Sequence, residues 1–379
     1  MTFRGRRLPL LAGGMLALLA GVLGGLLRAG LQVPVLRIEH VALHAALMIG
    51  GFFGTVISLE RAAAHGRAPA YGAPVCAVAA TLTLVFADAP VLALLLLAAS
   101  GAVLTWVTWR LHLRQPMLHS RVLLVGAACF PIGALLWLAT GAFDAALGFW
   151  IDFLVLTIAG ERLELSRLMR PAPGARRLFV ALAALVVAGA AAWAVHPPAG
   201  QALTGIGLGA LGLWLLRHDI ARRTARAAGL TGFIGRTLLI GHGWLTLSGV
   251  LMLGWAAGLA PGLRDAALHA VLLGFVMSMV FAHAPIVFPV LLGVPMRHHA
   301  GAWIPVALLS ASLALRVVAD VAGLPGVHKA GVAGNAVALA AFVLSTLAAV
   351  VLGRRRATVG GQDLRPTPSS HPRPPSARG

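Results

Sequence analysis

Long apolar stretches alternate with short polar ones along nearly the whole chain. Each apolar stretch has about 17 to 25 residues, which is the length a helix needs to cross ~30 Å of hydrocarbon. Residues 91–97 (VLALLLL) are apolar without interruption, whereas a strand of an outer-membrane barrel alternates apolar and polar positions. The pattern therefore predicts about twelve transmembrane helices. We expect them at residues 8–27, 39–59, 72–88, 90–109, 122–142, 144–160, 178–195, 201–216, 236–257, 266–292, 301–320 and 330–352.

Composition and charge agree with an all-α membrane protein that lies in a lipid bilayer. Apolar residues make up 59% of the 379 residues and charged residues only 11%, which differs strongly from a soluble domain. The net charge is +19, but the arginines are spread over alternate loops, so we do not expect nucleic-acid binding. By the positive-inside rule these arginine-rich loops are cytoplasmic, and so are the N-terminus and the C-terminus.

The chain divides into a polytopic transmembrane domain (1–353) and a short tail (354–379). No soluble domain fits between the predicted helices, and from Arg354 onward the sequence is rich in Pro, Ser, Arg and Gly. We expect the tail to be cytoplasmic and disordered. Similar five-residue stretches begin at positions 44 (HAALM), 144 (DAALG) and 269 (HAVLL), each four predicted helices after the previous one. This spacing indicates three quasi-equivalent four-helix units in one bundle.

Five histidines lie within the predicted helices and are the main candidates for chemistry. Ionisable groups are costly in a bilayer, so they either have a function or face a partner inside the bundle. His40 and His44 are four residues apart and share one helix face. His44 and His269 lie at similar depths near the outer ends of their helices, while His242 and His283 form a second layer nearer the inner ends.

Two layers of histidine at matched depth are the arrangement that axial ligands of haem, or a copper site, require. Gly50, Gly51 and Gly54 below His44 would let a flat macrocycle approach the backbone closely. The alternative is that each histidine simply hydrogen-bonds to a neighbouring helix, as polar side chains in membrane bundles commonly do. The residues alone leave both interpretations open.

Other charged residues allow less specific interpretations. Asp152 lies halfway along the sixth predicted helix with no cation at its depth, so it is either protonated and hydrogen-bonded or part of a proton path. Glu161 and Arg162 are expected at the cytoplasmic rim, where ion pairs are common. The chain contains no Walker loop, dinucleotide fingerprint, HExxH, GxSxG or CxxCH motif, so it offers no support for the activities that those motifs carry.

The stretch His44-Ala45-Ala46-Leu47-Met48, followed by Gly51-Phe52-Phe53-Gly54, resembles the second helix of the heme-copper oxidase main subunit, where a similar stretch binds low-spin haem. Residues 269–289 look like the tenth helix of that family. A closer resemblance is to the NnrS family, twelve-helix proteins associated with haem, copper and the bacterial response to nitric oxide. The chain shares with that family a His-Ala-x-x-Met-x-x-Gly-Phe pattern at positions 44–52 and a His-Ala pair at 269–270.

The resemblance implies a multi-pass haem protein of the bacterial cytoplasmic (inner) membrane, which carries haem b, with copper as a second candidate cofactor. It makes His44 and His269 the first-choice axial ligands, with His40 as a substitute, and His242 with His283 as a second metal site. Such a protein would bind or respond to a small diatomic ligand such as nitric oxide. The sixth predicted helix lacks His-x-x-x-Tyr and the seventh lacks a His-His pair, so we do not expect oxygen reduction at a copper B centre. Whether the protein is an enzyme of another kind stays open.

A function of a different class also agrees with the sequence. Three quasi-repeats, 45 glycines and two prolines in the tenth predicted helix are typical of secondary transporters or exporters, in which helix bundles move against each other. The sequence does not predict the ligand, the redox partner or the oligomeric state.

Overall fold

The computed structural model describes residues 3–33, 40–87, 89–169 and 171–362, and within these ranges it consists of helices joined by short loops, with no strand. Twelve of its helical segments are long and apolar enough to cross a membrane. The predictions of an all-α fold and of twelve spans are therefore confirmed. The spans are Arg7–Arg28, Leu43–His65, Ala68–Phe86, Pro90–Arg114, Leu118–Thr140, Phe143–Met169, Pro173–Val195, Pro197–His218, Gly229–Ala256, Leu263–Leu291, Ala300–Ala322 and Pro325–Arg354.

Each span consists mainly of α-helix, and two spans contain a π-helix in the middle. The second span consists of α2 (His40–Ala45), the π-helix η1 (Ala46–Phe53) and α3 (Gly54–His65), and the tenth of α12 (Leu263–His269), the π-helix η4 (Ala270–Met277) and α13 (Ser278–Leu292). The other main helices are α1 (Phe3–Arg28), α4 (Gly72–Phe86), α5 (Pro90–Arg114), α6 (Leu118–Thr140), α7 (Phe143–Ser166), α8 (Pro173–Val195), α9 (Pro197–His218), α11 (Gly229–Ala256), α14 (Trp303–Ala322) and α15 (Pro325–Gln362), with the short α10 (Ala221–Thr224) between α9 and α11.

The observed spans differ from the predicted ranges mainly at their ends. The second span continues to His65 and the sixth to Met169, well past the predicted ends at 59 and 160. These extensions carry charged residues such as the exposed Arg167, whose apolar stem can lie along the helix while its charged head reaches water. A hydropathy pattern therefore ends before the helix does.

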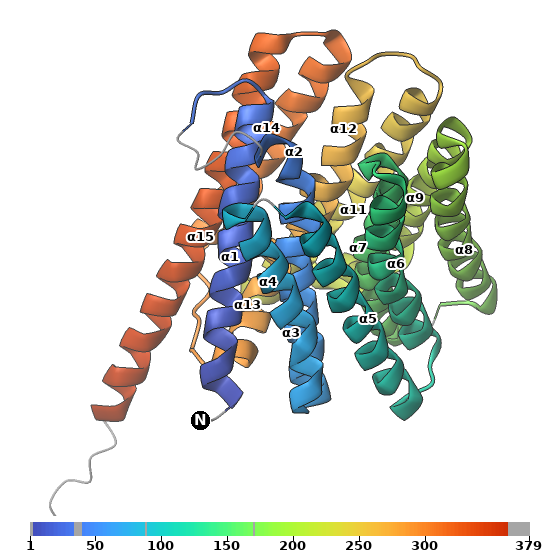
Figure 1. Cartoon of the computed structure of the whole chain (residues 1–379). Helices are drawn as coiled ribbons and strands as arrows, with labels where there is room; N and C mark the ends of the chain where they lie inside the picture. The colour runs from blue at the N-terminus through green and yellow to red at the C-terminus, as the bar shows by residue number, and fades with distance from the viewer. Residues whose placement is uncertain (1–2, 34–39, 88, 170, 363–379) are drawn as a thin grey trace, which may run out of the picture.

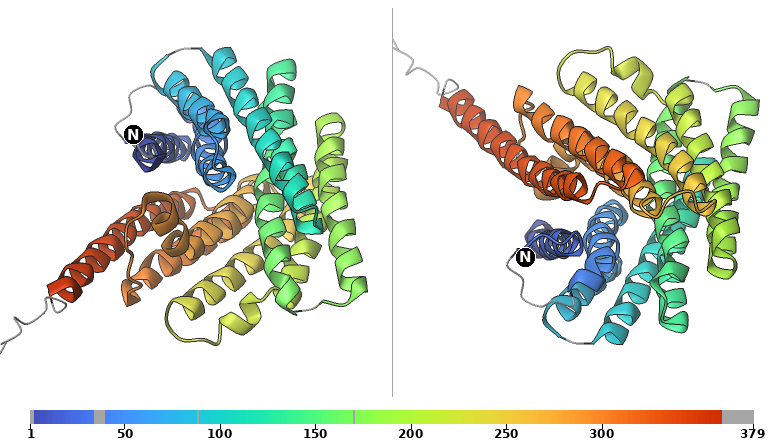
Figure 2. Two further views of the ribbon diagram at one scale, coloured as in Figure 1. Left: turned by 90° about the horizontal axis from the view of Figure 1, so that it is seen from below. Right: turned by 90° about the horizontal axis from the view of Figure 1, so that it is seen from above.

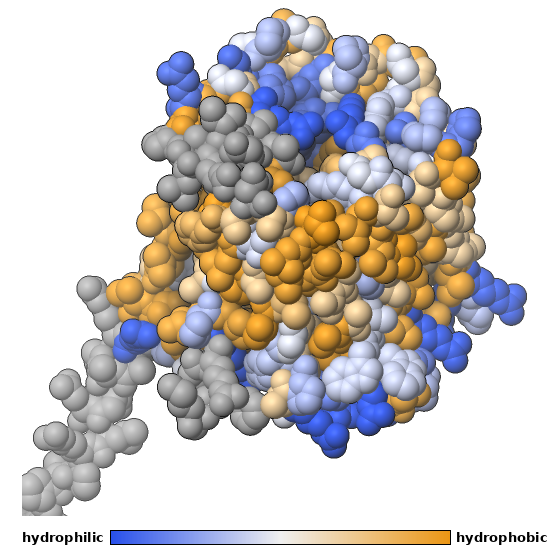
Figure 3. Space-filling model, viewed as in Figure 1, coloured by the Kyte–Doolittle hydropathy of each residue, from blue (hydrophilic) through white to orange (hydrophobic). Residues whose placement is uncertain are grey.

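An apolar belt surrounds the middle of the molecule. Figure 3 shows hydrophobic residues across the centre of one face and hydrophilic residues at both ends. Large apolar side chains of this surface are strongly exposed, among them Val91 (59%), Leu213 (58%) and Leu344 (67%). Such a continuous apolar surface is unfavourable in water and is stable against lipid. The belt supports a protein that spans a bilayer.

Small residues allow neighbouring helices to approach closely. A Cβ atom added to Gly249 of α11 would lie 2.4 Å from the backbone nitrogen of Gly209 in α9, a distance that no real Cβ contact shows. Glycine lets these two backbones touch, which is a common way to bring membrane helices together because lipid gives no hydrophobic force between them.

The first span begins and the last span ends on the same side of the bundle, which we call the basal end (Figure 1). The opposite side is the distal end. Helices that follow each other in the chain pack together, and α1 also contacts α13 and α15. The views along the bundle in Figure 2 show α1 beside the second span on one side and the last spans on the other. The first, second, tenth, eleventh and twelfth spans thus meet in one region, although a division into three four-helix units stays a prediction.

The predicted boundary at residue 354 does not coincide with the end of the last helix, because α15 continues to Gln362. The rest of the predicted tail, residues 363–379, lies outside the described residues. The disorder of the tail and the division of the chain at 353 therefore stay predictions.

Candidate functional site

A pocket of about 370 Å³ lies near the distal end, between α1, the second span, the tenth span, α14 and α15. Its volume falls within the range of about 300–1,000 Å³ that is usual for small-molecule and cofactor sites. Aliphatic and aromatic side chains form most of its wall, while arginines, an aspartate and an asparagine lie among them. Figure 3 shows hydrophilic residues gathered around a hollow at this end of the molecule. The pocket thus combines an apolar interior with concentrated charge.

A π-helical segment follows each of two histidines of the pocket. His44 lies in the last turn of α2, immediately before the π-helix η1, and His269 is the last residue of α12, immediately before the π-helix η4. A π turn holds more residues than an α-helical turn, so it changes the direction in which later side chains point. Such segments are rare and are frequent at functional sites. The local backbone therefore marks both histidines independently of their chemistry.

The imidazoles of His44 and His269 face each other across the pocket. Their ring centroids are 6.3 Å apart, and the ring planes differ by 26°. Two metal–imidazole bonds of about 2 Å, plus about 1 Å from each nitrogen to its ring centre, add up to about 6 Å. The spacing of the rings is therefore close to what a single metal ion between them would need.

The orientation of His44 is fixed by the backbone of α1. Its Nδ1 donates a hydrogen bond to the carbonyl oxygen of Gly21 at 2.6 Å, so the lone pair of the neutral ring is on Nε2. Nε2 makes no hydrogen bond within the described part of the chain. A Cβ atom on Gly25 would lie 2.9 Å from Cε1 of the ring, so glycine at this position gives the imidazole its room. His44 is thus held as a metal ligand is held in known sites.

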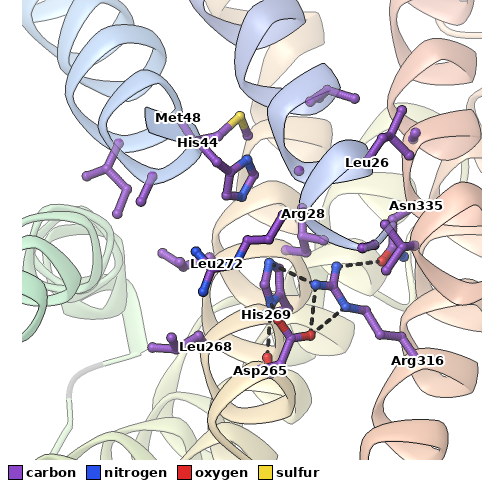
Figure 4. Close-up of a pocket in the computed structure, with 18 of the residues that line it drawn as sticks. Leu26, Arg28, His44, Met48, Asp265, Leu268, His269, Leu272, Arg316 and Asn335 are labelled. Atoms are coloured by element: carbon purple, nitrogen blue, oxygen red, sulfur yellow. Dashed lines mark hydrogen bonds and ion pairs between the residues drawn. The ribbon is translucent and has the colours of Figure 1, made fainter. Parts of the chain in front are cut away.

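His269 is also anchored, but its second nitrogen already has a partner. Nδ1 donates to the carbonyl oxygen of Asp265 at 2.9 Å, and Nε2 accepts a hydrogen bond from Nη2 of Arg316 at 3.2 Å. Arg316 also donates to the Asp265 carboxylate at 2.8 Å and to Asn335 at 3.4 Å (Figure 4). A metal ion bound to Nε2 of His269 would therefore displace the hydrogen bond from Arg316, which would keep its hydrogen bonds to Asp265 and Asn335.

The charges around the pocket match a ligand that carries carboxylates. Arg28, Arg264 and Arg316 all line the pocket, and Asp265 is the one acidic residue of its lining. Arginine binds carboxylates well because its planar guanidinium donates two parallel hydrogen bonds. Haem joins a flat apolar ring to two carboxylates, and the pocket offers opposed imidazoles, apolar walls and arginines. The residues present therefore fit haem.

The structure places the other predicted residues elsewhere or leaves them undescribed. His40 begins α2, but its side chain lies outside the described residues, so its role as a substitute ligand stays a prediction. His242 and His283 lie in the basal half of the bundle on α11 and α13. Within the described residues these two rings make neither a ring contact nor a hydrogen bond with each other.

Each of these two histidines faces a charged residue that is buried. Nε2 of His283 accepts a hydrogen bond from Arg162 at 2.9 Å, and Arg162 is only 4% exposed. Nε2 of His242 lies 3.5 Å from Oδ2 of Asp219, and both side chains are fully buried. Burial raises the pKa of the Asp219 carboxyl, while the nearby Arg162 and two backbone N–H groups oppose this shift. We call Arg162, Asp219, His242 and His283 the basal cluster.

The basal cluster supports a metal site less well than the distal pocket does. The guanidinium of Arg162 occupies Nε2 of His283, as that of Arg316 occupies Nε2 of His269. The distal pocket differs in that a cavity lies between its two rings and Nε2 of His44 makes no hydrogen bond within the described residues. A second metal site at His242 and His283 therefore stays a prediction.

Two expectations about charged residues change with the structure. The interpretation of Arg162 as a rim residue is wrong: Glu161 pairs with Arg61 of α3, whereas Arg162 turns into the bundle. Adjacent residues point to different faces of a helix, so only one of the two can reach the rim. Asp152 is fully buried, and neither carboxyl oxygen has a hydrogen-bond partner among the described residues, so the expected hydrogen bond is not found.

The sequence did not identify several residues of the distal pocket, in particular Arg316, Asp265 and Asn335. A signal existed for Asp265, because it precedes His269 by four residues and so lies on the same helix face. Arg316 lies within an apolar span, which is unusual for an arginine, but its partners come from other helices and only the packing reveals them.

Comparison with known proteins gives one match. A family model described as "Domain of unknown function (DUF8744)" matches residues 7–351, which include the distal pocket and the basal cluster. No curated protein and no solved structure matches the chain.

Proposed function

The chain belongs to the DUF8744 family of unknown function, and we propose that it is a haem-binding protein of a bacterial cytoplasmic membrane. The observation that carries this proposal is the pair of imidazoles, His44 and His269, which face each other across a largely apolar pocket with centroids 6.3 Å apart. The likeness of residues 44–52 to the haem-binding helix of the oxidases and of NnrS proteins points to the same cofactor.

Each part of the pocket has a role in this proposal. His44 and His269 would hold the iron, and the apolar side chains around Met48 and Leu272 would enclose the ring (Figure 4). Arg28 and Arg264, which also line the pocket, would pair with its carboxylates, Arg264 in exchange for its ion pair with Asp144. Bound haem supplies an iron that carries an electron or binds a small diatomic ligand. The rest of the chain fixes the imidazoles and keeps water from the apolar part of the pocket.

The two histidines are held differently, and this difference supports binding of a diatomic ligand. His44 has only a backbone partner, whereas His269 can return to Arg316 when its nitrogen is free. His269 would therefore hold the iron less firmly than His44, because Arg316 competes for its Nε2. The chemistry that haem would supply here is an iron able to bind a molecule such as nitric oxide. This role agrees with the resemblance to the NnrS family; copper, as in that family, is a second candidate cofactor.

We also propose that the basal end faces the cytoplasm. The basal ends of the spans carry most of the arginines, and the positive-inside rule places such ends on the cytoplasmic side. The distal pocket then lies near the outer surface of the membrane, where a small ligand arriving from outside reaches it first.

The test is an absorption spectrum of the purified full-length protein, expressed in iron-replete cells. We expect a Soret band, and a haemochrome assay should give about one haem per chain. Replacement His44→Ala should abolish the band, while the control His112→Ala, at the basal end of α5, should leave it unchanged. Protein without a Soret band, both as purified and after incubation with haem, would overturn the proposal.

A secondary transporter is the second candidate. The π segments interrupt two spans beside the pocket, and interrupted helices at a central site are typical of transporters. Uptake of a carboxylate solute by proteoliposomes, together with the absence of haem, would favour this candidate over the first.

A further inference from the structure

Three potential metal ligands from three different helices meet beside the distal pocket. Asp265 belongs to α12, Asp320 to α14 and His328 to α15, and one ligand atom from each lies within 4.8 Å of the others. This is the one group of three such side chains found in the described part of the chain. We refer to it as the carboxylate–histidine cluster. Neither the resemblance to haem proteins nor the proposed function makes use of it.

An atom of Asp320 provides independent evidence that something else binds here. The Asp320 side chain is only 5% exposed, and its Oδ1 atom pairs with Nδ1 of His328. The Oδ2 atom is buried and receives no hydrogen bond from an N–H or hydroxyl group within the described residues; its nearest polar neighbour is the carboxyl group of Asp265. A buried carboxylate oxygen without a partner costs free energy, and native structures satisfy such atoms with water or an ion.

The charges around the cluster are not evenly balanced. Arg316 donates to the carboxylate of Asp265. The one basic contact of Asp320 within the described residues is His328. Two carboxylates in close proximity repel each other. A divalent cation that both carboxylates share would remove this repulsion.

We propose that the carboxylate–histidine cluster binds a divalent transition-metal ion of the Zn²⁺ type. Two carboxylate oxygens and one imidazole nitrogen are ligands that Zn²⁺ accepts, and the absence of a thiolate or thioether from these three side chains disfavours Cu⁺. Ligands of a tetrahedral zinc ion are about 3.3 Å apart, given bonds of about 2.0–2.1 Å. Small side-chain rotations would bring the three groups from within 4.8 Å of one another to that spacing.

The surroundings are suited to this role. Arg316 donates to Oδ2 of Asp265, and metal-binding carboxylates are commonly held by such outer hydrogen bonds. Three protein ligands leave a fourth position for water or another small ligand. Asp265 also holds His269 through its carbonyl oxygen, so an ion in the cluster would stabilise the position of that imidazole. Ion binding itself does not depend on haem.

The experiment measures metal binding to the full chain, purified without a histidine tag in detergent. After treatment with a chelator, the protein is dialysed against Zn²⁺, and bound metal is measured by mass spectrometry. We expect about one Zn²⁺ per chain, and at least about a tenfold weaker affinity after Asp320→Asn or His328→Ala. The control variants are Asp144→Asn and His196→Ala, which remove an exposed carboxylate and an exposed histidine at the same end of the bundle.

Two results would contradict the proposed metal site. Unchanged Zn²⁺ affinity in Asp320→Asn and His328→Ala, or no stoichiometric Zn²⁺ in the wild type, would show that the cluster is an ordinary Asp–His pair. Size-exclusion profiles establish that the variants fold, and Asp265→Asn provides a further variant if one of them does not. Haem content is measured in parallel, so failure of the metal site can be told apart from failure of the haem proposal.

Discussion

The distal pocket and the basal cluster each contain two histidines from different spans, yet they differ in what these histidines can do. In the distal pocket the rings face each other across open space, and Nε2 of His44 makes no hydrogen bond within the described chain. In the basal cluster Arg162 and Asp219 fill the positions next to the rings. Two histidines at similar depth therefore do not make a ligand site by themselves; a cavity and a free lone pair are also needed.

The largest expected effect is loss of haem from a variant of the distal pocket, with no such loss from the basal cluster. Replacement His269→Ala should lower the haem content of purified protein at least about tenfold, because it removes one of the two imidazoles proposed to hold the iron. His283→Ala should keep its haem, because His283 does not line the distal pocket. Equal loss of haem in both variants, measured by the haemochrome assay, would contradict the distinction between the two regions.

The second prediction concerns stability of the basal cluster. Replacement Arg162→Met removes a buried guanidinium that donates a hydrogen bond to His283, and a hydrogen bond from a charged group contributes about 1.5–3 kcal/mol. We expect a clearly lower thermal unfolding midpoint in detergent. Arg167→Met is the matched control, because Arg167 pairs with Glu164 at the surface, where such a pair contributes about 0–1 kcal/mol. A midpoint unchanged by Arg162→Met would mean that the cluster does not stabilise the bundle.

The third prediction tests the room around His44. Replacement Gly25→Ala would place a methyl group 2.9 Å from Cε1 of the ring, so the imidazole must shift. We expect the affinity for haem to fall by roughly tenfold, as a disturbed ligand position usually costs, and the Soret band to change in position. Gly243→Ala is the control, because nothing lies within 4 Å of its added Cβ atom. Identical haem titrations for the two variants would argue against His44 as a ligand.

The smallest expected effect is a pH dependence of the basal cluster. Burial raises the pKa of Asp219, so the folded state favours the protonated carboxyl. The stabilisation from this protonation is fully present below the unfolded pKa of about 3.9 and is lost as the pH rises through the folded pKa. The unfolding midpoint of the wild type should therefore decrease relative to that of Asp219→Asn as the pH rises from about 4 to 7. A constant difference between the two would exclude this coupling.

The sequence predicted the correct architecture and the two histidines that face each other. His44 and His269 have similar depths because each follows the outer end of its span by a few residues, and depth along a helix is simply proportional to residue number. The same reasoning gave His242 and His283 as a pair, but it could not reveal that Arg162 and Asp219 lie next to them. Depth is one coordinate of a position, and two residues at equal depth can still face different neighbours.

By itself, the sequence determined that the chain forms twelve apolar helices, because the length and hydropathy of a span are local properties of the residues in it. Only the tertiary structure decided which side chains meet. The π segments after His44 and His269 alter the direction of the side chains that follow, and Arg316 reaches His269 from another helix. Rotation and neighbours depend on how all helices pack together, and no single stretch of sequence contains that information.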